Sequence, residues 1–261
     1  MDLMQTIILG LIQGLTEWLP ISSTGHLRLA EHFFGLGTPI LFDGLLHIGT
    51  LLVTLVFFRK DIRNILVALG KRDFKTENGK LIPLIIVGTV PTALIGVIFG
   101  NVIEAFFSNL LPIAGAFIFC GVALYSSKIG NERKESISYL EALAIGTAQG
   151  IAITPGISRS GLTITMALLL GVKREKAFKF SFLLSVPAII GALGLTLYEQ
   201  HDALVLAGVG WTEILVGVAV SMVVAYFALT LLRKIISYKK FYLFAFYCWL
   251  LGIVLIALSL S

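Results

Sequence analysis

Five stretches of this chain run for about twenty residues without an aspartate, glutamate, lysine or arginine. They are residues 81–100, 105–127, 180–198, 214–232 and 241–261. A helix needs about 20 apolar residues to cross the hydrocarbon core of a bilayer. A sixth stretch, 44–58, is shorter, but it extends back past Asp43 to about residue 40. The pattern predicts an all-α integral membrane protein with six transmembrane helices.

The distribution of charge predicts how these helices are oriented. Only 13% of the residues are charged, against about 25% in a soluble protein. Of the 20 lysines and arginines, 18 fall in four segments: 59–80, 128–134, 173–179 and 233–240. Cytoplasmic loops collect lysine and arginine, so these segments are expected inside. The connections without lysine or arginine, 34–42, 101–107 and 199–211, are expected outside.

Other patterns narrow the class of protein. The net charge of +5 follows from these loops, so a nucleic-acid partner is not expected. The first residues lack a basic region, which argues against a cleavable signal peptide. Cys120 and Cys248 lie in apolar spans and are predicted to be unreactive buried thiols. No Walker, HExxH or CxxC motif is present. The expected location is the plasma membrane, with several passes.

A short segment occurs twice, 136 positions apart. Residues 10–25 and 146–161 share six identities in sixteen positions, where chance gives about one. The shared residues are Gly10, Gln13, Gly14, Ile21, Ser22 and Gly25, which recur as Gly146, Gln149, Gly150, Ile157, Ser158 and Gly161. Each copy is interrupted by proline and glycine. The chain is therefore built from two related halves, about 1–130 and 137–261, within a single membrane domain.

Each copy is predicted to form a re-entrant helical hairpin. The two arms of the first, 3–19 and 24–35, are too short for two good spans, and irregular backbone at membrane depth is tolerated only inside protein or beside a wet cavity. The second hairpin covers 141–172. Three spans separate the copies, so the second is inverted. The charge pattern agrees: the first hairpin opens outside and the second inside. Broken helices at matching positions of an inverted-topology repeat point to a site near the membrane midplane.

The first hairpin carries an acid and a base. Glu17 lies within an apolar run, where an ionisable residue is a functional candidate. Gln13 lies on the same helix face as Glu17, which suggests a polar ligand pocket or part of a metal-binding site. His26 follows the hydroxyl-rich turn formed by Ser22, Ser23 and Thr24, and it suits proton transfer.

The second hairpin carries a cation. Arg159 lies in an otherwise uncharged stretch and needs a partner. It can form a structural ion pair with Glu17 or bind phosphate oxygens with both prongs of its guanidinium. Around it lie the expected substrate-binding residues Ser158, Ser160, Gly161 and Thr163, where a helix N-terminus offers amides to an anion. Two residues are predicted to be structural: Arg28 as an interfacial residue and His47 as a satisfied core histidine.

The hairpin motifs resemble one known family. The residues that carry the resemblance are Gln13-Gly-Leu-Thr-Glu17, Pro20-Ile-Ser22-Ser23-Thr24-Gly25-His26 and Pro155-Gly156-Ile-Ser158-Arg159-Ser160-Gly161-Leu-Thr163. They are similar to the undecaprenyl-diphosphate phosphatases of the integral-membrane, bacitracin-resistance type. The resemblance covers nearly the whole chain.

The resemblance implies release of the terminal phosphate from a polyprenyl diphosphate, which recycles the lipid carrier of cell-wall or glycan synthesis. It implies a divalent cation, Mg or Ca. Where many members have a first glutamate this chain has Gln13, so the metal would be held mainly by Glu17 and the diphosphate. The matching catalytic residues are Glu17, His26, Ser22, Ser23, Ser158 and Arg159. The sequence leaves the nucleophile open among Ser22, Ser23, Ser158 and water.

Two further questions stay open from sequence. A transporter or flippase of polyprenyl phosphate lipids is the rival function, because inverted repeats with broken helices are common in transporters. The pair Glu17 and His26 favours the enzyme, since binding alone does not need an acid and a base. The active-site mouth is expected outside the cytoplasm. Prenyl length and the formation of a homodimer are not fixed by the sequence.

Overall fold

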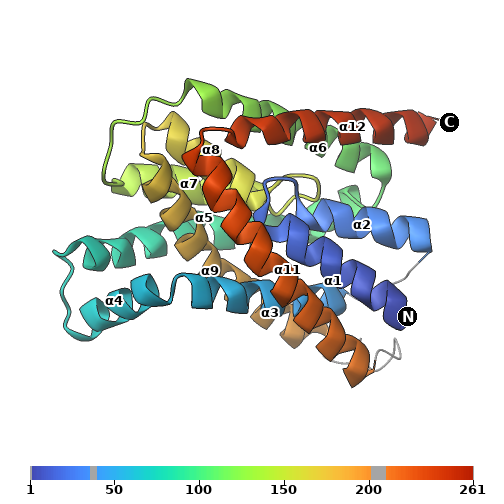
Figure 1. Ribbon diagram of the computed structural model, residues 1–261, viewed down its shortest axis with the longest axis horizontal. Coiled ribbons are helices and arrows are strands. Elements are labelled where there is room, and N and C mark those ends of the chain that lie inside the picture. The colour runs from blue at the N-terminus through green and yellow to red at the C-terminus, as the bar shows by residue number, and fades with distance from the viewer. Residues whose placement is uncertain (1, 36–39, 201–209, 261) are drawn as a thin grey trace.

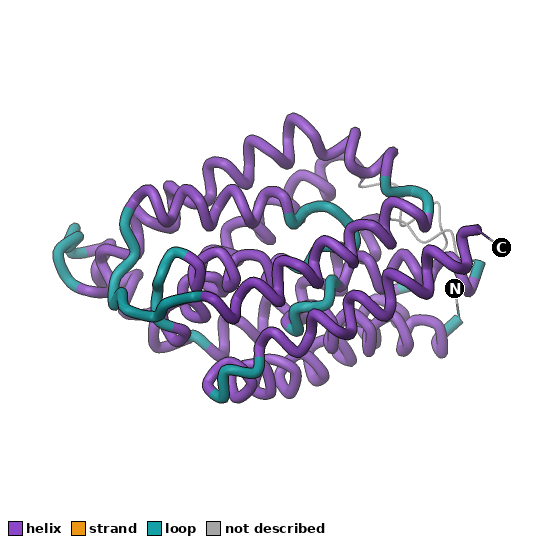
Figure 2. The backbone as a smooth tube through the Cα atoms, turned by 90° about the horizontal axis from the view of Figure 1, so that it is seen from above, coloured by secondary structure: helices purple, strands orange, loops and turns teal. Residues whose placement is uncertain are grey.

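The computed structural model describes residues 2–35, 40–200 and 210–260, which are helical and contain no strand (Figure 2). The first half holds α1 (Leu3–Trp18), α2 (Ser23–Phe34), α3 (Ile40–Phe57), α4 (Arg59–Gly70), α5 (Glu77–Phe106), α6 (Leu110–Ser126) and the short 3-10 helix η1 (Ser127–Ile129). The second half holds α7 (Tyr139–Ile151), α8 (Arg159–Leu169), α9 (Arg174–Gln200), α11 (Trp211–Ser237), η2 (Phe241–Leu243) and α12 (Phe244–Leu260).

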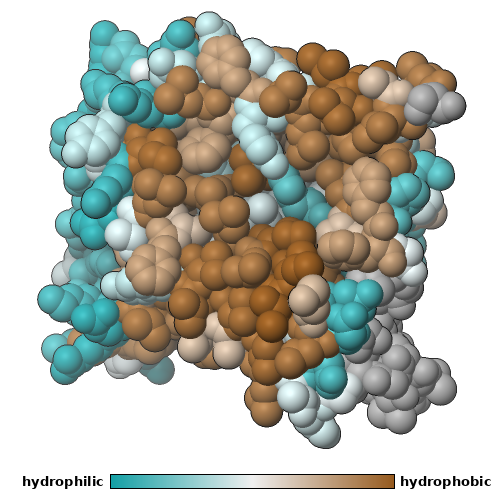
Figure 3. All heavy atoms as spheres, turned by 45° about the vertical axis from the view of Figure 1, so that its right-hand side comes forward, coloured by the Kyte–Doolittle hydropathy of each residue, from teal (hydrophilic) through white to brown (hydrophobic). Residues whose placement is uncertain are grey.

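Five helices in the described residues are long and apolar enough to cross a membrane: α5, α6 with η1, α9, α11, and η2 with α12. A sixth crossing is obtained if α3 and α4 are counted as one span, bent by 76° at Phe58. The prediction of an all-α membrane protein is therefore confirmed, with five candidate spans, or the predicted six when the bent pair is included. Apolar side chains cover the middle of the surface in Figure 3, and hydrophilic side chains gather along its left and right edges.

The positions of the chain ends and loops follow the charge pattern. In Figure 1, the basic segments around α4, the connection from η1 to α7 and the start of α9 lie in the left half of the molecule. Both termini lie at the right-hand end, together with the turn between α5 and α6. The two ends of the α1–α2 pair also lie to the right, and those of the α7–α8 pair to the left.

Three predicted connections are partly helical. The basic segment 59–80 was expected to be a loop, but Arg59–Gly70 forms α4 and α5 begins at Glu77. The connection 101–107 is shortened because α5 continues to Phe106. Helix α9 begins at Arg174, within the third basic segment. A helix can continue through charged residues, whereas a count of uncharged residues marks only the part expected in hydrocarbon. Residues 36–39 and 201–209 of two other connections lie outside the described residues.

Backbone geometry explains why the repeated segments break. In the first, Ser22 has φ of +69°, and its Oγ accepts from Gly25 N at 3.3 Å and caps α2. In the second, Gly156 has φ of +94°, and Ser158 Oγ accepts from Gly161 N at 3.1 Å and caps α8. A serine at the N-cap satisfies one of the amides that a helix start leaves without a partner. The shared serine therefore starts the second arm in both copies.

The shared glycines bring helices together. A Cβ atom at Gly10 or Gly14 would lie 2.8 Å or 2.5 Å from carbonyl oxygens of α11. A Cβ atom at Gly146 would lie 2.0 Å from the carbonyl oxygen of Gly88 in α5. Thus α1 packs on α11 and α7 packs on α5, and each pair joins the two halves. Small residues at such interfaces let helix backbones approach closely in membranes.

Substituting Gly146→Ala should lower thermal stability, because the new methyl group would overlap the backbone of α5. Overpacking of this kind costs about 1–3 kcal/mol. Gly115 in α6 is a matched control, because a Cβ atom there would have no neighbour within 4 Å. Thermal unfolding in one detergent measures both variants. Equal melting temperatures for Gly146→Ala and the unmodified protein would contradict the close contact.

Candidate functional site

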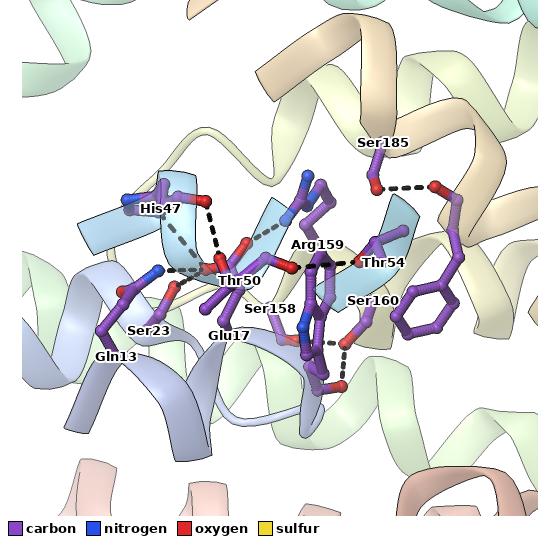
Figure 4. A network of polar contacts seen from close by, with 12 residues as sticks. Gln13, Glu17, Ser23, His47, Thr50, Thr54, Ser158, Arg159, Ser160 and Ser185 are labelled. Carbon is purple, nitrogen blue, oxygen red and sulfur yellow. Dashed lines mark hydrogen bonds and ion pairs between the residues drawn. The ribbon is translucent and has the colours of Figure 1, made fainter. Parts of the chain in front are cut away.

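Glu17, in the last turn of α1, is the centre of a buried polar cluster (Figure 4). It is 5% exposed. Its Oε2 accepts hydrogen bonds from Gln13 Nε2 at 3.1 Å and from Ser23 Oγ at 2.6 Å. His47 Nε2 lies 3.3 Å from the same oxygen, and the Arg159 guanidinium forms an ion pair with Oε1. The carboxylate thus receives contacts from α1, α2, α3 and α8.

Arg159 reaches this carboxylate from the other half of the chain. It is the first residue of α8, and its guanidinium also lies over the Trp18 ring, 5.3 Å from the ring centroid. Its side chain is 18% exposed. The pairing with Glu17, one of the two partners considered from sequence, is present. It leaves the phosphate role open, because a phosphate that entered here would compete with Glu17 for the guanidinium.

The turn between α1 and α2 contacts the turn between α7 and α8. Ser22 Oγ accepts a hydrogen bond from Gly156 N at 3.0 Å, and Ser160 Oγ donates to the Trp18 carbonyl at 2.9 Å. A Cβ atom at Gly25 would lie 2.9 Å from Gly156 N. Each turn therefore holds the other in place, and this contact brings Glu17 and Arg159 together.

The other residues predicted around Arg159 have partners at the start of α8, in α1 or in α9. Ser158 Oγ caps the helix and lies 3.2 Å from Ser160 Oγ. Gly161 packs closely against Ser158. Thr163 Oγ1 donates to the Arg159 carbonyl at 2.7 Å and lies 2.5 Å from Ser181 Oγ. These contacts place Ser158, Ser160, Gly161 and Thr163 around Arg159, and none of the four hydrogen-bonds Glu17.

His26 has partners other than Glu17. Its Nδ1 lies 2.7 Å from the Ser22 carbonyl, and its Nε2 lies 2.7 Å from the Tyr247 hydroxyl of α12. The two rings are nearly parallel, with centroids 5.7 Å apart. The expectation that Glu17 and His26 share acid and base duties is therefore not reflected in a direct contact between them.

The histidine beside Glu17 is His47, which the sequence reading assigned to the core. Both ring nitrogens have partners, because Nε2 faces the carboxylate while Nδ1 bonds the Asp43 carbonyl at 2.7 Å. The prediction from sequence did not indicate that one of these partners is Glu17. A signal was present in the sequence. His47, Thr50 and Thr54 repeat at helical spacing inside an apolar span, and both threonines are fully buried. A polar stripe along one face of a membrane helix indicates a face turned toward protein or a cavity.

One buried side-chain oxygen without a hydrogen-bond partner lies beside Glu17. Gln13 Oε1 is buried and has no hydrogen-bond partner, and it adjoins the Glu17 carboxylate. Among the described residues, no group of three or more histidine, cysteine, aspartate or glutamate side chains is arranged to hold a metal ion by itself. Mg²⁺ is commonly bound by one or two carboxylates together with substrate phosphates. These oxygens fit a cation that binds together with a phosphorylated substrate, whose phosphate oxygens would supply the remaining ligands.

The fold and the site define a class of protein: a helical membrane protein with five or six candidate spans and a buried polar site. In that site a carboxylate meets an arginine at a helix N-terminus.

The chain belongs to a known family. Residues 6–254 match the family described as Bacitracin resistance protein BacA. The chain is 44% identical over 265 residues to the undecaprenyl-diphosphatase of Carboxydothermus hydrogenoformans, covering 99% of this chain and 98% of the relative. It is 42% identical over 272 residues to the undecaprenyl-diphosphatase of Desulforapulum autotrophicum, covering 97% of each. It is 43% identical over 262 residues to that of Treponema denticola, covering 97% and 96%.

Proposed function

We propose that this protein hydrolyses undecaprenyl diphosphate to undecaprenyl phosphate and inorganic phosphate. The observation that carries the proposal is the meeting of Glu17 and Arg159 from two separate broken helices in a buried site. Relatives that share over 40% of the sequence are named for this reaction. Recycling of a lipid carrier and resistance to bacitracin follow from the same activity.

Arg159 and the first amides of α8 would hold oxygens of the terminal phosphate. When the phosphate draws the guanidinium away, Glu17 is released to act as a base. It takes a proton from the attacking water, the water oxygen bonds to the terminal phosphorus, and the anhydride bond to the inner phosphate breaks. The lipid monophosphate leaves and inorganic phosphate remains. Catalysis of phosphoryl transfer depends mostly on positioning and charge stabilisation, which these residues supply.

The choice of nucleophile narrows to water or Ser23. Ser23 Oγ already donates to Glu17 at 2.6 Å, so the carboxylate is placed to take its proton. Ser22 and Ser158 use their hydroxyl oxygens to accept backbone amides. If Ser23 attacks, Glu17 takes its proton, Oγ bonds to the terminal phosphorus, and the anhydride bond breaks so that the lipid monophosphate leaves. Water then hydrolyses the phosphoserine, which releases inorganic phosphate and restores the Ser23 hydroxyl.

A divalent cation completes the proposed site. Gln13 Oε1 and Glu17 would hold it together with the diphosphate, and it would neutralise charge on the phosphate oxygens. Mg and Ca both accept such oxygen ligands.

We propose that the α1–α2 and α7–α8 pairs are re-entrant hairpins of an inverted repeat. In the first pair α1 packs on α11, and in the second pair α7 packs on α5; α11 and α5 are corresponding spans of opposite halves. The first hairpin opens away from the basic segments, which supports a plasma-membrane protein with an active-site mouth outside the cytoplasm.

Cysteine labelling in intact cells tests this orientation. An impermeant thiol reagent should label Ser108→Cys, between α5 and α6, and should spare Lys75→Cys and Ser237→Cys. The native cysteines are buried and serve as background. The opposite pattern would overturn the outside-facing mouth.

Phosphate release tests the enzymatic function. Purified protein with undecaprenyl diphosphate in detergent should release inorganic phosphate, and a chelator of divalent cations should stop the release. The rival flippase predicts a different result. Proteoliposomes would move a polyprenyl monophosphate between leaflets while the diphosphate stayed intact in detergent. Absence of phosphate release under all cation conditions would overturn the proposed hydrolase.

A further inference from the structure

We propose that His47 is the positioning residue for Glu17, and that it keeps the carboxylate in place when Arg159 turns to the substrate. His47 lies on α3, outside both broken helices. The inference rests on the proposed function and assigns a role to a residue beyond the repeated motifs.

The side chain of His47 is fixed at both ring nitrogens. Nδ1 lies 2.7 Å from the carbonyl oxygen of Asp43, one turn earlier on α3. That contact sets the plane of the ring, so Nε2 points at Glu17 Oε2, 3.3 Å away. A histidine whose second nitrogen bonds a backbone carbonyl is a common way to orient the first nitrogen toward a functional group.

The helix beneath His47 is itself held in place. Ser221 Oγ of α11 donates to the Leu46 carbonyl at 3.1 Å, directly before His47. Close packing of Gly49 against α11 fixes the same turn, because a Cβ atom there would lie 2.6 Å from the Val218 carbonyl. The histidine therefore stands on a rigid part of the fold.

The other residues that contact Glu17 each have a second role in the proposed reaction. Arg159 is needed by the phosphate, and Ser23 is a candidate nucleophile. Gln13 Nε2 remains, but its Oε1 is the second oxygen proposed for the cation. His47 is the contact that no other proposed step uses. The positioning of Glu17 during turnover thus falls chiefly to a helix that carries none of the sequence motifs.

His26 does not take this place. Its Nε2 is occupied by the Tyr247 hydroxyl at 2.7 Å, and no bond to Glu17 is present. The two histidines therefore have different partners, although both lie in apolar segments. Substituting one should not reproduce the effect of substituting the other.

The test compares His47→Leu with His47→Gln. Leucine fills similar space without a hydrogen-bond donor, whereas the Nε2 of glutamine can reach the position of histidine Nε2. Loss of a residue that orients a functional ligand typically lowers activity or metal affinity by about 10–100-fold. We expect His47→Leu to lower kcat by about that factor with little change in KM. His47→Gln should restore most of kcat.

A double-mutant cycle separates positioning from general stability. In a Glu17→Gln background, His47→Leu should cause no further loss of kcat, because the carboxylate that it positions is gone. His32→Leu is the matched control, since this histidine of α2 is exposed, and it should behave like the unmodified protein. Melting temperatures are recorded on the same preparations.

The outcomes distinguish the two proposals. If the unmodified protein releases no phosphate, the proposed function fails. If it is active and His47→Leu keeps full kcat, only the role of His47 fails. A loss of melting temperature without a fall in kcat, or an equal fall in the Glu17→Gln background, would also overturn the positioning role.

Discussion

Replacement of Arg159 by lysine is expected to give a folded, membrane-inserted protein that has lost about 10²-fold or more of its phosphate-releasing activity. Lysine keeps a positive charge and can still pair with Glu17, so the buried carboxylate keeps a counter-ion. It loses the planar two-pronged donor that matches phosphate oxygens. It also loses the contact of the guanidinium with the Trp18 ring.

This variant separates the two partners of Arg159. If the guanidinium serves only the ion pair with Glu17, Arg159→Lys should be modestly impaired. If it holds the phosphate as charge develops, activity should fall while the fold remains. Phosphate release and thermal unfolding on one preparation measure both properties. A folded lysine variant with nearly full activity would exclude the phosphate-binding role.

Substituting Glu17→Gln should reduce hydrolysis by at least the roughly 10²-fold that loss of acid–base catalysis produces. The amide keeps the size of the side chain but cannot accept a proton from water or hold a cation by charge. Arg159 would then be buried without its counter-ion. Removing one partner from a buried ion pair typically costs about 3–5 kcal/mol, so the melting temperature should fall as well.

Binding and turnover must be measured separately for this variant. Assays at a temperature where the variant is fully folded remove the stability effect from the rate. Substrate binding should largely persist, because Arg159 and the start of α8 are unchanged. Near-normal turnover would leave Glu17 a structural role and would favour a lipid transporter over a hydrolase.

Several features could be predicted from the sequence because they depend on local composition. Hydrocarbon thickness sets the length of an uncharged run, so the spans were visible without coordinates. The repeated segment marked both breaks, because a serine at an N-cap starts a new helix through local hydrogen bonds, as Ser22 does for α2 and Ser158 for α8. The convergence of Glu17 and Arg159 followed from the position of each at a break.

The tertiary structure decided which side chains meet. Ser22 and Ser23 are adjacent in sequence, but one accepts the Gly156 amide and the other donates to Glu17. His26 belongs to the motif, yet its ring bonds Tyr247, 221 positions away. His47 belongs to no motif and lies against Glu17, 30 positions earlier, because α3 packs beside α1. Hydrophobic spacing fixes which residues form a helix, but the rotation of each helix about its axis is set by packing against neighbours distant in sequence.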